Sequence, residues 1–475
     1  MRRLPLRLHS LVTAIAIATV ASACTHTTIT GPRLGNEPFL DTLQSRTFDF
    51  FWQTTPPATG LTPDRWPTKS FSSIAAVGFA LAAYPVGVER GYVSRSDAAT
   101  RTLNTLRWFY RAPQGPAPSG TSGNMGFFYH FLDMDTGQRF QTVELSTIDT
   151  ALLLGGVLFC REYFDQPNDT EASIRAYADS LYLRVDWTQA TTPQTAPRIS
   201  MGQSPEHGWL PYSYQGYDEA MLLYVLALGS PTHPIDASAW AAFTSTYTWA
   251  PFYDQAHVNF APLFGHQYSQ MFIDFRGIQD PFMKSHGIDY FENSRRATLS
   301  QRSYAIANPG GYTDYSANIW GLTASDGPSD TTLTLGGRTR QFFSYRARGA
   351  AANEVTDDGT LAPTAAGGSI AFAPEISIPA LKAMRQKYGN ALFQQYGFLD
   401  AFNPTFTDAG AARAGKVVPG IGWVDTDYLG IDQGPILGMI ENYRSGLIWK
   451  YMRKSPYIRK GLERAGFTGG WLTTQ

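Results

Sequence analysis

Residues 146–160 read STIDTALLLGGVLFC, and this stretch decides the fold class. Its apolar side chains follow no single stripe but cover every side of the predicted helix. A helix that is apolar all round must be enclosed by other parts of the protein. Five further stretches have the same character, at residues 72–87, 217–229, 266–275, 375–384 and 432–443. We therefore expect six buried helices.

Six amphipathic stretches alternate with the buried ones along the chain. They lie at residues 36–54, 94–112, 169–185, 236–247, 287–307 and 388–397. Their spacing of apolar residues is typical of helices with one face in solvent. The alternation predicts an all-α fold, an (α/α)6 barrel of six inner and six outer helices, formed by a single domain over residues 37–475. Residues 331–349, TTLTLGGRTRQFFSYRARG, predict a small β-containing loop excursion before the fifth inner helix.

The segments that precede the inner helices carry the polar and aromatic side chains. Consecutive antiparallel helices would make all inner helices run the same way, so these segments would gather at one rim. They include PDRWPTKSFSS (63–73), VELSTID (143–149), WLPYSYQGYDE (209–219) and WVDTDYLGID (423–432). We expect the functional site at this rim.

Carboxylates dominate the predicted rim, and glycosidic bond hydrolysis needs two of them, one acid and one base or nucleophile. Asp149 has capping-box spacing from Ser146, and Asp432 stands three residues before Pro435, so both also fit a helix-capping role. Glu219 is the best candidate for the acid, because nearby aromatic residues would raise its pKa by burial, against the opposing effect of a helix N-terminus. The candidates are Glu144, Asp149, Asp218, Glu219, Glu375, Asp400, Asp427 and Asp432.

Aromatic and polar residues beside the acids are candidates for binding a sugar chain. We predict stacking of sugar faces on tryptophans and tyrosines, and hydrogen bonds from the rest to hydroxyl groups. Each tryptophan also fits a place in the core, and His130 fits an ordinary loop histidine. The predicted substrate-binding residues are Arg65, Trp66, His130, Trp209, Tyr214, Tyr217, Gln267, Trp320, Glu375 and Trp423.

Composition narrows the function classes. The formal net charge is −1, so the chain has no basic footprint for nucleic acid. Aromatic residues make up 14% of the chain and charged residues 16%, a balance that suits neutral, hydroxyl-rich ligands or simply a large core. The sequence contains neither paired cysteines nor a metal-binding histidine pair, P-loop or dinucleotide fingerprint. We expect neither metal nor cofactor, and a monomer.

The N-terminus has the pattern of a bacterial lipoprotein signal. A basic start and an apolar stretch lead to ASAC at 21–24. We predict a signal peptide over 1–23, lipidation of Cys24 and a tether over 24–36; an ordinary signal peptide is the alternative. Thr25 gives no inner-membrane retention signal of the Asp type, so we expect an outer-membrane anchor facing the periplasm. Only Cys160 then remains as a thiol, in a buried stretch.

Several motifs together resemble a known family. They are TGLTPDRWP (59–67), GFFYHFLDMDTG (126–137), YDEAMLLYVLALGSPTHP (217–234), QYSQMFIDFRGIQD (267–280), WGLTASDGP (320–328) and IDQGPILGMIENYRSGLIWK (431–450). The chain resembles the bacterial glycoamylase-like domain and, within it, glycoside hydrolase family 144, the endo-β-1,2-glucanases. The resemblance extends from about Phe48 to Trp449.

This resemblance implies an (α/α)6 barrel and hydrolysis of β-1,2-glucan with inversion, without a cofactor. Glu219 matches the acid of the family's Y-x-E-A motif. Asp400 is the first choice for the base, with Asp149, Glu144 and Asp432 behind it, and the proton path can run through a substrate hydroxyl. Exo action or another β-linkage is the alternative, followed by a polysaccharide lyase or a glycan-binding lipoprotein without catalysis.

Overall fold

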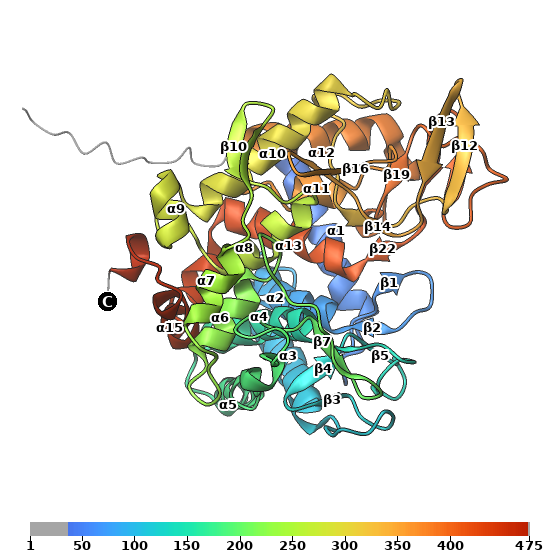
Figure 1. Cartoon of the computed structure of the whole chain (residues 1–475). Coiled ribbons are helices and arrows are strands. Elements are labelled where there is room, and N and C mark those ends of the chain that lie inside the picture. Colours follow the sequence, from blue (N-terminus) through green and yellow to red (C-terminus); the bar gives the residue numbers. More distant parts are fainter. Residues whose placement is uncertain (1–36, 474–475) are drawn as a thin grey trace, which may run out of the picture. The chain divides into compact units, whose positions relative to one another are not determined.

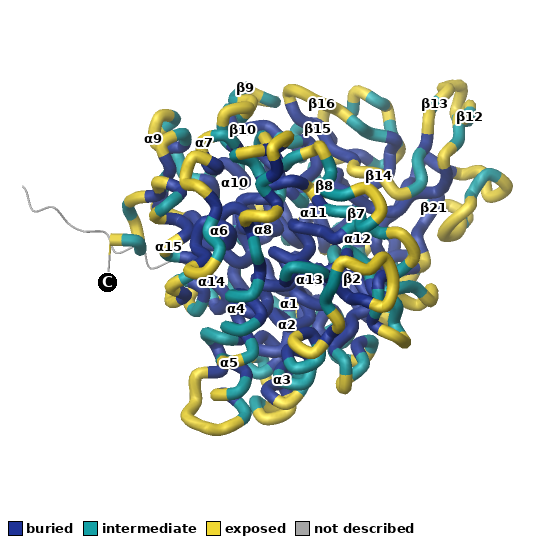
Figure 2. Tube along the Cα trace, turned by 60° about the horizontal axis from the view of Figure 1, so that its bottom comes forward, coloured by how far each residue is buried: buried dark blue, intermediate teal, exposed yellow. Residues whose placement is uncertain are grey.

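Four helices are buried on nearly every side in the computed structural model, which describes residues 37–473. In α2, every residue from Ile74 to Gly87 is buried, and α6 is buried over its whole length. Figure 2 shows these helices as the dark interior of the chain trace. The four are α2 (Ile74–Glu89), α4 (Thr147–Tyr163), α6 (Met221–Gly229) and α13 (Gly430–Arg444).

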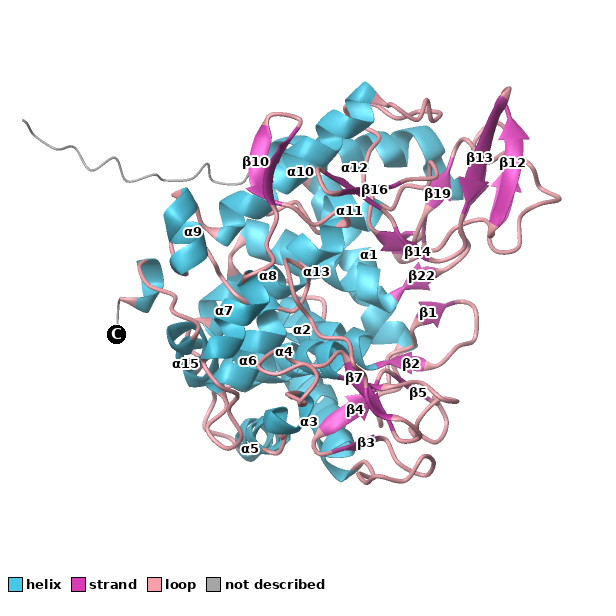
Figure 3. Cartoon of the chain, viewed as in Figure 1, coloured by secondary structure: helices cyan, strands magenta, loops and turns pink. Residues whose placement is uncertain are grey.

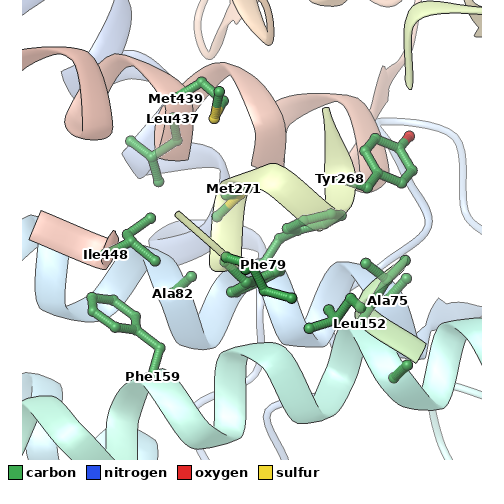
Figure 4. Close-up of a cluster of buried hydrophobic side chains, with 14 of the residues drawn as sticks. Ala75, Phe79, Ala82, Leu152, Phe159, Tyr268, Met271, Leu437, Met439 and Ile448 are labelled. Atoms are coloured by element: carbon green, nitrogen blue, oxygen red, sulfur yellow. The ribbon is translucent and has the colours of Figure 1, made fainter. Parts of the chain in front are cut away.

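Small residues let the buried helices approach one another closely. A Cβ atom on Gly156 of α4 would lie 2.0 Å from the carbonyl oxygen of Gly78 of α2, so only glycine fits there. Beside this crossing, Phe79 of α2 stacks on Phe272 with ring centroids 6.1 Å apart. Figure 4 shows the cluster that fills the space between α2, α4 and α13. Burial of these apolar surfaces is the main stabilising contribution to the fold.

Amphipathic helices surround this interior. Ser94, Asn168 and Asp289 accept hydrogen bonds from backbone N–H groups and cap three of them. The amphipathic helices are α1 (Pro38–Thr54), α3 (Arg95–Arg111), α5 (Asp169–Leu183), α7 (Ser238–Thr244), α10 (Tyr290–Ala307) and α12 (Pro374–Tyr388). The remaining helices are α8 (Tyr268–Phe272), α9 (Pro281–His286), α11 (Pro363–Gly367), α14 (Leu447–Met452) and α15 (Pro456–Arg464), with 3-10 turns at Trp187–Ala190, Leu263–His266, Gly389–Ala391 and Gly470–Leu472.

The second half of the chain departs from the predicted alternation. Residues 375–384 lie in α12, which has exposed positions at Glu375 and Lys382, so this helix is amphipathic and not enclosed. Residues 388–397, predicted as an outer helix, form a 3-10 turn followed by a hairpin. Residues 266–275 yield only the short α8, because the chain is extended again at Ile273. A helix-rich fold is therefore confirmed, while the count of six inner and six outer helices stays a prediction.

The strands form small sheets that pin the segments leading into the buried helices. Figures 1 and 3 show most of them along one side of the helices. The largest sheet has the order β3 (Gly123–Asn124), β4 (Phe127–Tyr129), β6 (Leu145–Ser146), β7 (Gly202–Ser204), β8 (Gly208–Trp209), and a three-stranded sheet the order β19 (Phe402–Asn403), β21 (Gly422–Val424), β20 (Lys416–Val418). The antiparallel pairs are β1 (Arg65–Trp66) with β22 (Tyr428–Leu429), β2 (Ser72–Ser73) with β5 (Phe131–Leu132), β9 (Trp249–Phe252) with β10 (Gln255–Val258), β11 (Ala324–Ser325) with β14 (Arg346–Ala347), β12 (Thr331–Leu335) with β13 (Arg338–Phe342), β15 (Gly349–Ala351) with β16 (Glu354–Thr356), and β17 (Phe393–Gln394) with β18 (Gly397–Phe398).

Two of these pairings matter for the site. The β1–β22 pair sets Arg65 opposite Leu429, so the segments that precede α2 and α13 lie side by side. The β4–β6 pair places Tyr129 opposite Leu145, which brings His130 beside Glu144 at the start of α4. The predicted β excursion is also confirmed, since β12 and β13 form a hairpin that turns at Gly336 and Gly337, both with positive φ.

The residues from Pro38 onward form one compact unit. In the part of the chain that the structure describes, no helix has the length and apolarity needed to span a bilayer. The predicted signal peptide, Cys24 and the tether over 24–36 lie outside the described residues.

Candidate active site

Two adjoining cavities lie at the start of the buried helices. The first, about 350 Å³, is lined by Glu144, Asp149 and Glu219 among others, and the second, about 280 Å³, by Asp64 and Arg65 among others. Because the two cavities share part of their walls, they form one cleft. The shared lining residues are His130, Asp149, Tyr345 and Ile431.

Asp149 lies in the first turn of α4 and also faces the cleft. Its backbone N–H donates to Ser146 Oγ at 3.1 Å, and Ser146 Oγ donates back to Asp149 Oδ2 at 2.5 Å. Ser146 is therefore the N-cap of α4, and the Asp149 carboxylate accepts from its hydroxyl group. The carboxylate still lines both cavities, so capping and a place in the site do not exclude each other.

His130 lies between two of the predicted acids. Its Nδ1 is 2.8 Å from Glu144 Oε1, and its Nε2 is 3.5 Å from Asp149 Oδ2. Burial acts to lower the pKa of His130, but the neighbouring carboxylates outweigh it and raise the pKa to about 9. The imidazolium in turn holds the pKa of Glu144 below its usual value against the effect of burial. At neutral pH the His130 ring is therefore protonated beside the Glu144 carboxylate.

Glu219 has the properties of a general acid. It lies just before α6, its backbone carbonyl accepts a hydrogen bond from Ser269 Oγ at 2.6 Å, and its side chain lines the first cavity. Burial raises its pKa to about 7, and the charge of Asp149 acts in the same direction. The adjacent Asp218 has a local role instead, since its Oδ1 accepts from the N–H of Ala220 at 2.9 Å. Of the two acids in the YDEA motif, Glu219 is the one that faces the cleft.

A second group of carboxyl groups surrounds Arg65, and we call it the acidic cluster. Arg65 Nη1 lies 2.7 Å from Asp326 Oδ2, and its Nε lies 3.3 Å from Asp64. The N–H of Asp326 donates to Asp400 Oδ2 at 2.8 Å, which ties the predicted base to the same group. The acidic cluster consists of Asp64, Asp326, Asp400, Asp425, Asp427 and Asp432.

Protons and Arg65 offset the crowded negative charge of the acidic cluster. Burial raises the pKa of Asp400 well above its usual value, and the charges of Asp432 and Asp326 raise it further. Burial raises the pKa of Asp432 to about 7. Among the described residues, Asp326, Asp400 and Asp425 bring carboxylate oxygens within 4.8 Å of one another, the one set that could hold a metal ion.

Asp400 and Asp432 lie behind the cleft wall, each 2% exposed. They are linked to the cavity through Tyr268, which lines it. Burial raises the pKa of the Tyr268 phenol, and the nearby charges of Asp432, Glu219 and Asp400 raise it further. Tyr268 therefore lies within electrostatic reach of the predicted acid and of two of the four candidate bases, Asp400 and Asp432.

Tyr214 lies at the cleft in addition to Arg65 and His130, and Trp66 and Trp209 are sequence neighbours of residues that line it. Tyr214 lines the first cavity. Trp66 is 40% exposed and directly follows Arg65, on the strand that pairs with β22. Trp209 is partly buried, packs on Phe127 and precedes Leu210, which lines the first cavity.

Other predicted binding residues are corrected by their burial or position. Trp320 and Trp423 have no exposed surface, and Trp423 Nε1 donates to the carbonyl of Ala414 at 2.6 Å, so both tryptophans belong to the core. Tyr217 is 4% exposed and stacks on Tyr290. The predictions of stacking on these three residues are wrong for this conformation, because buried rings present no face to a ligand.

Gln267 and Glu375 have structural contacts elsewhere. The side chain of Gln267 is buried and donates to the carbonyl of Ala365 and to Ser369 Oγ, both at 2.9 Å, so it fastens the loop around α11. Glu375 is exposed and pairs with Arg295 at 2.6 Å on the surface. Neither residue lines the two cavities.

Some residues of the site were not predicted, because nothing in the sequence distinguishes them from their neighbours. Tyr345 lines both cavities, and Asp64, Asp326 and Asp425 complete the acidic cluster. Asp326 lies in the WGLTASDGP motif and Asp64 in TGLTPDRWP, so the quoted motifs contained them without giving them a role. Asp400 reaches the rim after the β17–β18 hairpin and not, as predicted, after an outer helix.

A helix-rich scaffold that gathers two groups of carboxyl groups around one cleft offers the pair of carboxyl groups that hydrolysis of a glycosidic bond needs. The family model for the glycoamylase family, described as "Putative glucoamylase", matches residues 211–456. The chain belongs to this family, which confirms the resemblance noted from the motifs.

Similar proteins with solved structures cover nearly the whole chain. A "putative glucoamylase" of Bacteroides uniformis is 32% identical, with a TM-score of 0.77 over 91% of this chain and 98% of that one. An endo-β-1,2-glucanase of Chitinophaga pinensis, solved with sophorotriose and glucose, is 28% identical, with a TM-score of 0.77 over 92% of this chain and 99% of that one.

A curated relative bears a different activity name. The exo β-1,2-glucooligosaccharide sophorohydrolase (non-reducing end) of Parabacteroides distasonis is 28% identical over an alignment of 464 residues that covers 90% of this chain. The match spans only 58% of that protein's length.

Proposed function

We propose that this protein hydrolyses β-1,2-glucan by endo cleavage with inversion at the anomeric carbon. The observation that carries the proposal is Glu219, a carboxyl group with a pKa of about 7 that faces the same cleft as the acidic cluster. A group with this pKa is protonated in a useful fraction at neutral pH and can donate a proton. The names of the relatives supply the substrate.

In the proposed reaction Glu219 protonates the leaving oxygen, and a second carboxylate activates water on the opposite side of the sugar. Asp400 is our first choice for that base, with Asp149, Glu144 and Asp432 as further candidates. Because burial raises its pKa, Asp400 acts as a base only in molecules in which this carboxyl group has lost its proton. Asp400 lines neither cavity, so its proton path runs through a sugar hydroxyl, as the motif resemblance implies. The ion group of Glu144, His130 and Asp149 then holds sugar hydroxyls.

Arg65, Trp66, Trp209 and Tyr214 are proposed to bind the sugar chain on both sides of the bond that is cleaved. Trp66 and Trp209 have exposed ring surface that can pack against the C–H faces of glucose. Arg65 is held by Asp326 and Asp64 and keeps donors directed along the cleft wall. We also propose that the buried and amphipathic helices complete an (α/α)6 barrel around this cleft.

Exo action is the second candidate, favoured by the name of the Parabacteroides distasonis relative. An exo-acting enzyme releases one uniform product from a chain end, whereas an endo-acting enzyme gives short oligosaccharides of mixed length.

The test is to incubate the purified domain, from Gly31 onward, with linear β-1,2-glucan and separate the products. We expect mixed oligosaccharides and new reducing ends, with inverted configuration in the first minutes by NMR. A uniform product establishes the exo alternative. Absorbance near 235 nm without hydrolysis would indicate a lyase, and binding without new reducing ends would leave only a glycan-binding role.

For localisation we propose a periplasmic lipoprotein anchored in the outer membrane through Cys24. The basic start, the apolar stretch and ASAC at 21–24 support it. Fractionation of cells that express the full chain tests the anchor: Cys24→Ala should move the protein from the membrane to the soluble fraction, and membrane retention of that variant would contradict it.

A further inference from the structure

Tyr345 lies where the two cavities of the cleft meet. It lines both of them, and 49% of its surface is exposed. It belongs to the excursion, which in the structure extends beyond the predicted 331–349 to 324–356, from β11 to β16, and it directly precedes β14. Leu429 of β22 lines the second cavity together with Tyr345.

The surroundings of Tyr345 relate it to the acid and to the acidic cluster. Glu219 and Tyr268 share the first cavity with it, and Arg65 and Asp64 share the second. An exposed aromatic ring between these groups offers an apolar face and a hydroxyl in a wall that is otherwise rich in charge. Carbohydrate sites use such rings, because sugars have apolar C–H faces and polar edges.

A buried ion pair fixes the excursion beneath Tyr345. Arg348 has no exposed surface, and its Nε and Nη2 donate to the two carboxylate oxygens of Asp358 at 2.7 and 2.9 Å. Its Nη1 donates to the carbonyl of Ser325 at 2.9 Å, and Nη2 donates to the carbonyl of Phe343 at 3.0 Å and to that of Ser344 at 3.1 Å. One guanidinium therefore fastens the start of the excursion and the residues just before Tyr345.

The same guanidinium reaches the acidic cluster. Arg348 Nη1 donates to the carbonyl of Asp326 at 3.3 Å, and the N–H of Asp326 donates to Asp400 at 2.8 Å. A lysine in place of Arg348 would keep the charge, but its single ammonium group cannot make these contacts in several directions.

We propose that Tyr345 is a sugar subsite between Glu219 and the acidic cluster and determines how tightly the substrate is held, and that Arg348 is the positioning residue that fixes it. This inference rests on the proposed hydrolysis of β-1,2-glucan. The proposal gives the excursion a function, namely to place Tyr345 in the wall of the cleft.

The test compares Tyr345→Ala and Tyr345→Phe by steady-state kinetics on linear β-1,2-glucan. Tyr345→Ala should raise KM about tenfold or more, whereas Tyr345→Phe, which keeps the ring, should stay within about twofold. Titration calorimetry of β-1,2-glucooligosaccharides measures the loss of affinity without turnover. It compares the Glu219→Gln variant with the double variant that also carries Tyr345→Ala. Tyr110→Ala is the matched control, because Tyr110 is 44% exposed on α3 and lines neither cavity.

The positioning role is tested with Arg348→Lys and, as a second variant that preserves shape, Asp358→Asn. Both should raise KM and lower kcat per folded molecule, whereas Arg346→Lys, at an exposed neighbour in β14, should change neither. A purely structural role would lower the melting temperature and leave KM and kcat of the folded fraction unchanged, which would overturn the positioning role.

The outcomes separate this inference from the proposed function. Cleavage by the unmodified protein with an unchanged KM in Tyr345→Ala would overturn the subsite alone. Absence of both cleavage and oligosaccharide binding in the unmodified protein would overturn the proposed function, and the subsite with it.

Discussion

The Nδ1 atom of His130 lies 2.8 Å from Oε1 of Glu144, while Nε2 of the same ring faces Asp149 at 3.5 Å. A ring with a carboxylate at each nitrogen is stabilised in its protonated form, and its pKa is raised to about 9. The group therefore contributes to stability as well as to the wall of the cleft.

Replacement of His130 by Gln should make stability less dependent on pH. The folded-state pKa of His130 lies above its unfolded value of about 6.5. Its contribution is thus fully present below about pH 6.5 and is lost as pH rises through about 9. Urea unfolding of both proteins across this range should give a difference in unfolding free energy that shrinks with pH. A difference in unfolding free energy that grows toward high pH would contradict the stabilisation of protonated His130 by Glu144 and Asp149.

Replacement of Glu219 by Gln should lower kcat/KM by about 10²- to 10⁴-fold, the range that general acid catalysis contributes. The melting temperature should not fall, because burial disfavours the ionised glutamate and glutamine has no charge. Activity on β-1,2-glucan and thermal unfolding at pH 7.5 measure the two effects. Glu375→Gln is the control, since Glu375 is an exposed glutamate paired with Arg295 away from the cavities.

The assignment of Glu219 as the general acid also predicts how kcat/KM depends on pH on the alkaline side. With a pKa of about 7, Glu219 loses its proton as pH rises, so kcat/KM should decline above about pH 7. Persistence of full activity at pH 9, or of an unaltered profile in the residual activity of Glu219→Gln, would mean that another group is the acid.

Replacement of Asp400 by Asn should lower kcat by about 10²- to 10⁴-fold if Asp400 is the base. The charge of Asp432 raises the pKa of Asp400, so Asp432→Asn should also change kcat. Asp408→Asn, in an exposed turn, is the control. Full activity of Asp400→Asn, together with loss of activity in Asp149→Asn or Glu144→Gln, would show that the base is one of the carboxylates beside His130 and not Asp400.

Helix type and position were predictable where the local pattern alone decides them. Residues 72–87 and 146–160 are apolar all round, and α2 and α4 are buried as expected, with Ser73 and Ser146 as their N-caps. The pattern failed at 375–384, because the buried residues lie on one face, with Ile376, Ala380, Leu381 and Met384 among them, while Pro379 and Lys382 are exposed. The short run was mistaken for an enclosed helix.

Site residues were predictable only where they lie in the segments just before the buried helices or in strands that pair with those segments. Glu219, Asp149, Glu144 and His130 all lie in segments that precede or pair with the start of a buried helix. Tyr345 was not predictable, since the segment that carries it is held by hydrogen bonds of Arg348 to Ser325, Asp326, Phe343, Ser344 and Asp358. Long-range hydrogen bonds of this kind leave no periodic signal in the chain.

Replacement of Gly156 by Ala should destabilise the fold although alanine favours helices over glycine by about 1 kcal/mol. The added Cβ would lie 2.0 Å from the carbonyl oxygen of Gly78, a backbone atom that cannot turn aside, so α2 and α4 would have to separate. Overpacking of this kind costs about 1–3 kcal/mol. Urea unfolding measures the loss, and Gly115→Ala is the control, because its nearest neighbour would be a methyl group of Thr121 at 3.7 Å. Stability of Gly156→Ala equal to that of the unmodified protein would show that α2 and α4 do not cross in contact, and the cleft built on their first turns would lose its support.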